Sequence, residues 1–291
     1  MSWLQLSFPA TSEQVDSLSD VLWGLGAVSV TVRDAGDKPV LEPGPGETPI
    51  WDLSFIDGLF AADDISESDL ESALATLADI PEYQISEVPD QDWERAWLAD
   101  FKPMQFGSRL WIVPTAFAPV EGAVNIILDP GLAFGTGTHP TTDLCLQWLD
   151  ASPPERMNVL DFGCGSGILA IAALKLGAKK LTAVDIDPQA ITATISNAQI
   201  NQVESGLISG LPDILQSEQF DLVLANILSG PLVELAPKLA SHVKPGGQIV
   251  LSGILSEQAD DVLNAYKDSF NMDPVQEKEG WVRLSGKRIA K

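Results

Sequence analysis

A glycine-rich turn between a buried strand and a helix constrains the fold of this chain more than any other feature. Residues 158–162 predict an apolar strand, and residues from 168 onward predict an apolar helix. Between them lie Gly163, Gly165 and Gly167. Glycines remove Cβ atoms where a chain turns tightly or where a ligand approaches the backbone. The free N–H groups of the following helix face such a ligand, so the sequence predicts a nucleotide-binding turn.

Strand and helix patterns alternate regularly from residue 106 onward. Apolar runs such as residues 222–225 suit strands that are buried on both faces. Regular alternation predicts an α/β domain with a parallel sheet and helices on both faces, which is a Rossmann-like arrangement. The predicted strands are 109–113, 124–128, 158–162, 181–185, 220–225 and 247–252, and the predicted helices are 168–177, 188–200, 231–240 and 256–266.

The first part of the chain has a different order of elements. Residues 15–25 carry apolar side chains at helical spacing, and residues 27–33 are rich in β-branched side chains that favour a strand. The order β-α-β-β-α-β predicts a ferredoxin-like α+β domain over residues 1–89. Its predicted strands are 3–8, 27–33, 51–56 and 82–88, its helices are 15–25 and 66–78, and the glycine- and proline-rich stretch 34–49 is a loop.

A linker helix is predicted between the two domains, within residues 90–105. Trp93, Trp97 and Phe101 recur every fourth residue and therefore share one helix face. Lys102 and Pro103 end the pattern. The stripe either packs on one domain or carries one domain over the cleft of the other. The remaining residues, 106–291, form the second domain.

Charge is distributed unevenly along the chain. The formal net charge is −24. Residues 1–100 hold 3 basic and 21 acidic side chains, whereas the remainder holds 14 and 20. An acidic body of this kind repels nucleic acid and attracts a basic partner. A general acidic bias of the source organism's proteins is an equal explanation.

The chain has no sequence signal for export or for membrane insertion. Its N-terminus lacks a basic segment followed by an apolar stretch, and no run of about 18 apolar residues occurs. The two cysteines, Cys145 and Cys164, suggest no disulfide framework. No set of His, Cys and carboxylate residues has metal-ligand spacing. We therefore expect a cytoplasmic monomer without a metal.

An acidic residue follows the glycine turn at the distance that a nucleoside ligand requires. Asp185 ends the next predicted strand, where its carboxylate can accept hydrogen bonds from both hydroxyls of a ribose. Asp187 and Pro188 instead suit the N-cap and first position of a helix. The glycines are spaced G-x-G-x-G after Asp161, unlike the G-x-G-x-x-G of nicotinamide sites.

An asparagine lies at the end of the strand predicted at residues 220–225. Asn226 lies at the carboxyl end of residues 220–226, the edge where open parallel sheets bind ligands. Its amide can hold an amine nitrogen for reaction. Asn226 is followed by Ile-Leu-Ser and not by Pro-Pro-Tyr, which argues against nucleobase and glutamine substrates. The alternative for Asn226 is a helix N-cap.

Three motifs carry a family resemblance. The pattern D-x-G-x-G-x-G at residues 161–167 resembles the first motif of S-adenosylmethionine-dependent methyltransferases. The loop Asp129-Pro-Gly-Leu-Ala-Phe-Gly-Thr-Gly-Thr-His-Pro-Thr-Thr142, with Asp92-Trp-Glu-Arg-Ala-Trp97, resembles the ribosomal protein L-eleven methyltransferase family over nearly the whole chain.

This resemblance implies a fold, a reaction and a set of site residues. It implies a class I methyltransferase domain behind a ferredoxin-like substrate-recognition domain, with S-adenosylmethionine as cofactor. The implied reaction methylates the α-amine and lysine ε-amines of ribosomal protein L-eleven, a basic protein, without direct contact to nucleic acid or membrane. Asn226 is the implied catalytic residue, and Phe134, Gly135 and Thr136 border the methyl-transfer site. The implied cofactor contacts are Thr142, Gly163, Gly165, Asp185 and Asn226.

Three other readings remain open from the sequence. His139 could act as a general base, although a loop histidine that bonds locally is the simpler interpretation. The enzyme could instead methylate another protein or a small-molecule amine. A protein that binds the cofactor without catalysis is the third reading, and the threonine-lined loop of residues 131–142 argues against it.

Overall fold

The computed structural model of the chain describes residues 2–36, 51–77, 80–88, 102–129 and 139–290. The chain divides into two compact units, Met1–Ala96 and Trp97–Lys291, which are considered separately below. The helix predicted for residues 90–101 lies outside the described residues. No helix within the described ranges is long and apolar enough to cross a membrane.

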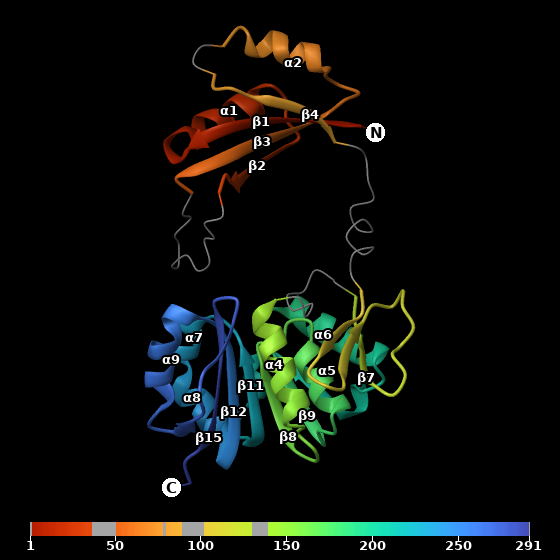
Figure 1. Ribbon diagram of the computed structural model, residues 1–291, viewed down its shortest axis with the longest axis vertical. Helices are drawn as coiled ribbons and strands as arrows, with labels where there is room; N and C mark the ends of the chain where they lie inside the picture. Colours follow the sequence, from red (N-terminus) through yellow and green to blue (C-terminus); the bar gives the residue numbers. More distant parts are fainter. Residues whose placement is uncertain (1, 37–50, 78–79, 89–101, 130–138, 291) are drawn as a thin grey trace. The chain divides into compact units, whose positions relative to one another are not determined.

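The first unit is a four-stranded antiparallel sheet covered by two helices (Figure 1). The strand order β2-β3-β1-β4 results from pairing β1 with both β3 and β4. Helix side chains such as Leu22 and Leu70 are buried against Phe8 of the sheet. The predicted ferredoxin-like order is confirmed. The elements are β1 (Trp3–Thr11), α1 (Val15–Gly24), β2 (Ser29–Asp34), β3 (Leu53–Ala61), α2 (Glu67–Leu74) and β4 (Gln84–Val88).

The second unit is built on an eight-stranded sheet. Five neighbouring strands are parallel, in the order β10-β9-β8-β11-β12, as the alternating pattern predicts. These strands are β8 (Asn158–Phe162), β9 (Lys180–Val184), β10 (Leu207–Gly210), β11 (Phe220–Asn226) and β12 (Val243–Leu255). The glycine turn leaves the carboxyl end of β8, near the centre of the sheet.

Three strands that were not predicted from the sequence add an antiparallel edge to this parallel sheet. β15 pairs antiparallel with β12, β13 and β14. A tight turn at Glu279 and Gly280, both with positive φ, reverses the chain before β15. Apolar alternation over these short segments was too weak to predict them. They are β13 (Phe270–Met272), β14 (Gln276–Lys278) and β15 (Trp281–Arg288).

Helices cover both faces of this sheet, as predicted. Helices α4, α5 and α6 pack with Val159 and Leu222 on one face, whereas α7, α8 and α9 pack with Leu160 and Val223 on the other (Figure 1). Each strand is therefore apolar at successive positions. The helices are α4 (Pro140–Ala151), α5 (Ile168–Lys175), α6 (Pro188–Ile200), α7 (Ser229–Glu234), α8 (Ala236–His242) and α9 (Ala259–Tyr266).

Two predicted element boundaries need correction, and proline explains both. The single helix predicted over 231–240 is two helices, because Pro237 at the start of α8 has no N–H to continue the preceding turn. The loop predicted over 129–142 ends at His139, because Pro140 takes the first position of α4, where a missing N–H costs nothing.

A small three-stranded sheet is fastened to the helices by two buried polar side chains. Asp150 at the end of α4 accepts hydrogen bonds from the N–H of Ser108 at 2.6 Å and of Arg109 at 3.2 Å. Asn201 after α6 bonds both the N–H and the carbonyl of Ile127, at 2.8 and 2.7 Å. The Asp150 bonds hold the turn between β5 and β6 at the end of α4, and the Asn201 bonds hold the end of β7 beside α6. The strands are β5 (Met104–Phe106), β6 (Leu110–Val113) and β7 (Val124–Ile127).

Candidate functional site

Three polar residues singled out in the sequence meet at one edge of the large sheet. Asp161 lies in β8, Asp185 directly follows β9, and Asn226 ends β11. Because β9, β8 and β11 are adjacent parallel strands, their carboxyl ends lie side by side at the edge where such sheets bind ligands.

The glycine turn adopts a backbone conformation that only glycine takes readily. Gly163, Gly165 and Gly167 have φ values of 82°, 53° and 80°. A Cβ atom on Gly163 would lie 2.2 Å from Cγ2 of Ile227, so no side chain fits there. The N–H groups of Gly163 and Cys164 donate to the carbonyl of Val184, at 2.8 and 3.1 Å. The turn therefore presents bare backbone at the site.

Helix α6 holds the other side of this turn. The Thr194 hydroxyl donates to the carbonyl of Gly165 at 3.1 Å, and the Asn197 amide donates to the carbonyl of Ser166 at 2.8 Å. A Cβ atom on Gly167 would lie 2.9 Å from the Thr194 side chain. The carbonyl groups of the turn are thus tied to α6, away from the sheet edge.

The carboxylate of Asp185 accepts a hydrogen bond from the glycine turn and has positions left for a ligand. One carboxylate oxygen accepts from the N–H of Gly165 at 2.9 Å, and the other accepts from the N–H of Asp187 at 3.0 Å. A carboxylate can accept about four hydrogen bonds, so two acceptor positions remain for the hydroxyls of a ribose. Asp187 caps α6 by accepting from the N–H of Gln189 at 2.8 Å, which confirms its predicted structural role.

Asp161 is a fully buried carboxyl group that forms no ion pair within the described ranges of the chain. Its side chain has 0% exposure, and neither oxygen has a hydrogen-bond partner among the described residues. Burial raises the pKa of Asp161 to about 7. The N–H of Ala170 is near enough to oppose this shift, although it makes no hydrogen bond of good geometry, and the charge of Asp185 adds to the shift. A buried carboxylate of this kind is best satisfied by a cationic ligand group.

A mainly apolar cavity of about 340 Å³ opens beside the turn. Gly163, Gly165, Asp185 and Asn226 line its polar side. Its apolar side was not predicted from the sequence. Ile186, which follows Asp185, is 83% exposed, as suits a side chain that covers a flat ring. The other apolar lining residues are Phe162, Val184, Pro212, Ile227, Leu228, Pro231 and Leu235.

Asn226 lies against the first turn of α4. Its amide nitrogen donates a long hydrogen bond of 3.4 Å to the hydroxyl of Thr142, which is buried. The alternative that Asn226 caps a helix is wrong, because Leu228 is the N-cap of α7. The structure thus brings Thr142 and Asn226 together.

The hairpin of β14 and β15 packs against the start of α4, near Thr142. The His139 ring meets the Trp281 ring edge to face, with centroids 4.7 Å apart, and Lys278 forms an ion pair with Asp143. Neither Trp281 nor Lys278 was singled out in the sequence, because the strands that carry them were not predicted. Phe134, Gly135 and Thr136 lie outside the described residues.

The histidine and cysteine side chains of this unit are engaged in local hydrogen bonds or buried in the core. His139 caps α4 and bonds Thr141, at 2.8 Å between Nδ1 and Oγ1, which confirms the interpretation of local bonding. Burial lowers the pKa of His139, and Glu279 opposes that shift. Burial raises the pKa of the Cys145 and Cys164 thiols to about 12, so both stay protonated. His242 is also buried and bonds the carbonyl of Glu218 at 2.9 Å.

The buried charge of Asp161 predicts a pH-dependent stability of the ligand-free protein. Because the folded pKa of about 7 lies above the ordinary 3.8, folding binds a proton between these values, and stability falls as pH rises through this window. Asp161→Asn removes this loss. We expect the variant's melting temperature, relative to the unchanged protein, to rise between pH 5 and pH 8 by several degrees. Calorimetric melting measures it, and a difference that is constant with pH would contradict a strained Asp161.

Comparisons with known proteins show which family this chain resembles over its whole length. The ribosomal protein L11 methyltransferase of Pseudomonas aeruginosa (strain LESB58) is 53% identical to this chain over 294 residues, covering 100% of both. The enzyme of the same name from Azotobacter vinelandii is 52% identical and covers 99% of this chain and 100% of that one. The crystal structure of a ribosomal protein L11 methylase from Lactobacillus delbrueckii subsp. bulgaricus, 36% identical, matches with a TM-score of 0.60 and covers 65% of this chain and 100% of that one.

A family model identifies the same family over almost the whole length of the chain. The model described as "Ribosomal protein L11 methyltransferase (PrmA)" matches residues 2–289. With a Rossmann-like sheet and the glycine turn at its carboxyl edge, the chain belongs to the ribosomal protein L11 methyltransferase family.

Proposed function

We propose that this chain transfers methyl groups from S-adenosylmethionine to the α-amine and lysine ε-amines of ribosomal protein L11. Family membership supports methyl transfer to L11, and the resemblance of the loop at residues 129–142 supports the choice of amines. The observation that carries the proposal is the placing of Asn226 and Thr142 beside a glycine turn with a buried, unpaired Asp161.

The residues around the turn fit the cofactor group by group. The unpaired carboxylate of Asp161 suits the α-ammonium of the methionine part, because burial makes a counter-charge favourable. Gly163 and Gly165 line the cavity and present backbone without side chains to this part of the cofactor. Asp185 holds the ribose hydroxyls, and the apolar cavity with Ile186 covers the adenine ring. When bound, the cofactor supplies an electrophilic methyl group on a sulfonium.

Asn226 then orients the accepting amine. Its amide nitrogen is engaged with Thr142, so its carbonyl oxygen is left to accept a hydrogen bond from the amine. A lysine amine with a pKa near 10.4 must lose its proton before it attacks, which costs roughly 4.6 kcal/mol at pH 7. Removal from water lowers that pKa, and the cationic sulfonium acts in the same direction. Alignment of nitrogen, carbon and sulfur is the main contribution of the protein, and the proposal needs no general base.

The acidic first unit is proposed to bind the basic substrate protein. Its described Arg33 is already paired with Asp57, at 2.6 Å, and lies over the Phe55 ring. Acidic side chains on α1 and α2, including Asp16, Asp20 and Glu67, are exposed. In this proposal residues 1–89 recognise L11, residues 90–105 link the domains, and residues 106–291 catalyse transfer. The enzyme acts as a cytoplasmic monomer, on free L11, without direct contact to nucleic acid or membrane.

The roles of Asn226 and Asp185 predict different kinetic effects. Asn226→Ala should lower kcat about a hundredfold, because the amine loses its alignment, with little change in cofactor affinity. Asp185→Ala should weaken cofactor binding at least tenfold, because charge-assisted bonds are worth about 1.5–3 kcal/mol each. Calorimetry gives the affinity, and mass spectrometry of methylated L11 gives the rate.

A matched control is available two residues away. Asp187→Asn keeps a capping side chain on α6 and should leave both constants unchanged. Equal kcat losses in the Asn226 and Asp185 variants, with unchanged cofactor affinity in both, would contradict this division of roles. An enzyme that labels a small molecule in cell extract but not L11 would support the alternative substrate class.

Recognition of L11 through opposite charges predicts that its affinity for the enzyme depends strongly on salt concentration. Raising the ionic strength from about 0.1 M to about 1 M shortens the Debye length from about 10 Å to about 3 Å. The affinity for L11, measured by calorimetry, should fall steeply over this range, because exposed opposite charges are screened. Affinity that is independent of ionic strength would contradict recognition by the acidic unit.

A further inference from the structure

A second pocket lies at the opposite edge of the large sheet. It has a volume of about 540 Å³ and is formed where β8, β11 and β12 begin and β15 ends. Asp221 is at the start of β11 and Asn226 is at its end, so about 17 Å of strand separates this pocket from the proposed methyl-transfer site. We call it the basic pocket, after its lining residues Arg156, Lys244 and Lys287.

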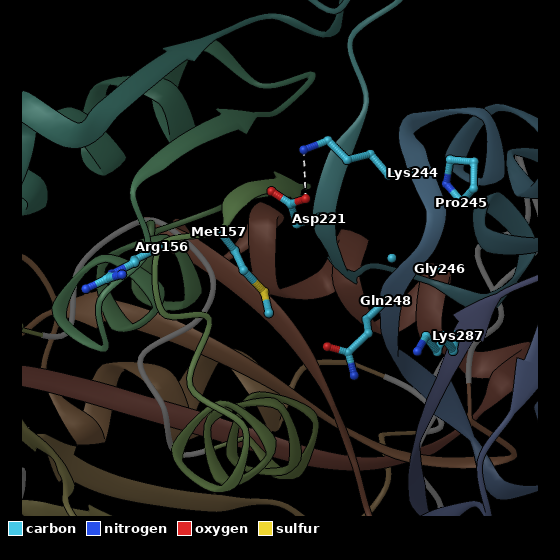
Figure 2. A pocket seen from close by; sticks show the side chains of 9 residues that line it. Arg156, Met157, Asp221, Lys244, Pro245, Gly246, Gln248 and Lys287 are labelled. Atoms are coloured by element: carbon cyan, nitrogen blue, oxygen red, sulfur yellow. Dashed lines mark hydrogen bonds and ion pairs between the residues drawn. The ribbon is translucent and has the colours of Figure 1, made fainter. Parts of the chain in front are cut away.

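The charges in the basic pocket do not balance. Asp221 is its only acidic lining residue, and both carboxylate oxygens are occupied. One accepts from Lys244 at 2.7 Å and the other from the N–H of Asn158 at 2.8 Å. Figure 2 shows this ion pair, with Arg156 on one side of the pocket and Lys287 on the other. Within the described part of the chain, Arg156 and Lys287 form no ion pair, so two positive charges remain uncompensated in a chain of net charge −24.

The backbone around the basic pocket is arranged to leave it open. Between Val243 and Gln248 the register of β12 against β11 shifts, so the intervening residues bulge out and carry Lys244 to the pocket. A Cβ atom on Gly247 would lie 2.9 Å from the backbone carbonyl oxygen of Asp221, so only glycine fits there. Arg156 has a φ of 61°, an uncommon conformation for a side-chain-bearing residue, and its N–H bonds the carbonyl of Gly177 at 2.7 Å.

The chemistry of this lining selects a small anion. Guanidinium and ammonium groups together favour phosphate, because Arg binds its oxygens in pairs and Lys supplies point charge. The volume lies within the range of about 300–1,000 Å³ of small-molecule sites. A nucleic acid would also meet the strongly negative remainder of the protein, whereas a small anion inside the pocket feels charges mainly within a Debye length of about 8 Å. We propose that the basic pocket binds a small ligand that bears a phosphate or diphosphate group.

The test is a calorimetric titration of the full-length protein with inorganic pyrophosphate at a constant ionic strength of about 0.15 M. We expect one saturable site per chain. The double variant Arg156→Gln/Lys287→Gln should bind about tenfold more weakly. Both side chains are exposed, and an unchanged melting temperature will show that the variant is folded. Arg156→Lys, which keeps the charge but loses the paired donors, should fall between the two.

A matched control removes two charges from the same edge of the sheet. Lys179 and Lys180 are exposed and do not line the basic pocket. Lys179→Gln/Lys180→Gln should leave pyrophosphate affinity unchanged. Absence of saturable binding, or an equal loss in this control, would overturn the proposal. A short oligoribonucleotide that binds the pocket more tightly than pyrophosphate would also overturn it, because the pocket would then bind the phosphate backbone of an RNA.

Discussion

The site depends on one buried carboxyl group that the protein itself does not satisfy. Asp161 lies in the central strand of the parallel sheet, fully buried and without a hydrogen-bond partner among the described residues. Burial raises its pKa to about 7, so the ligand-free protein holds a proton there near neutral pH. A ligand with an ammonium group replaces that proton by a fixed positive charge. The burial that destabilises the ionised group in the free protein therefore favours binding of the cofactor.

The surroundings of Asp161 are fixed by packing on both faces of the sheet. Val159 and Leu160 point to opposite cores and anchor β8 between two layers of helices. Thr194 and Asn197 of α6 hold the carbonyls of the turn, while Asp185 holds one of its N–H groups. The small sheet is held to the end of α4 by Asp150 and to the end of α6 by Asn201. The start of α4 in turn brings Thr142 to Asn226. In the proposed function, cofactor binding and alignment of the amine therefore rest on the same packed elements.

Much of the site could be predicted from the sequence because each step rests on a strict steric or chemical requirement. Gly163 and Gly167 have positive φ and no room for a Cβ atom, so glycine is required at both positions. The spacing of these glycines can therefore be recognised in the sequence. Asp185 and Asn226 follow apolar strands, so their place at the carboxyl edge follows from parallel topology. Asp187 and Pro188 predict the start of α6, because the N-cap needs a side-chain acceptor and the first helical position tolerates proline.

The parts that could not be predicted depend on contacts between distant segments. The reversal at Glu279, with a positive φ that the residue type does not announce, makes β15 antiparallel. Trp281 and Lys278 therefore reach α4 without any local signal. Ile186 and Leu228 look like ordinary apolar residues until the fold places them on one cavity. The break before Pro237 had a signal, the missing N–H of proline, but the apolar pattern across it was stronger.

Proton release on cofactor binding tests the role of Asp161 most directly. At pH 6 the Asp161 carboxyl is mostly protonated, while an α-amino group is already an ammonium. Titrations of S-adenosylmethionine in buffers of different ionisation enthalpy count the protons released. The account predicts release approaching one proton per chain, and almost none for Asp161→Asn. Binding without proton release, or equal release in the variant, would contradict the pairing of Asp161 with the cofactor's ammonium.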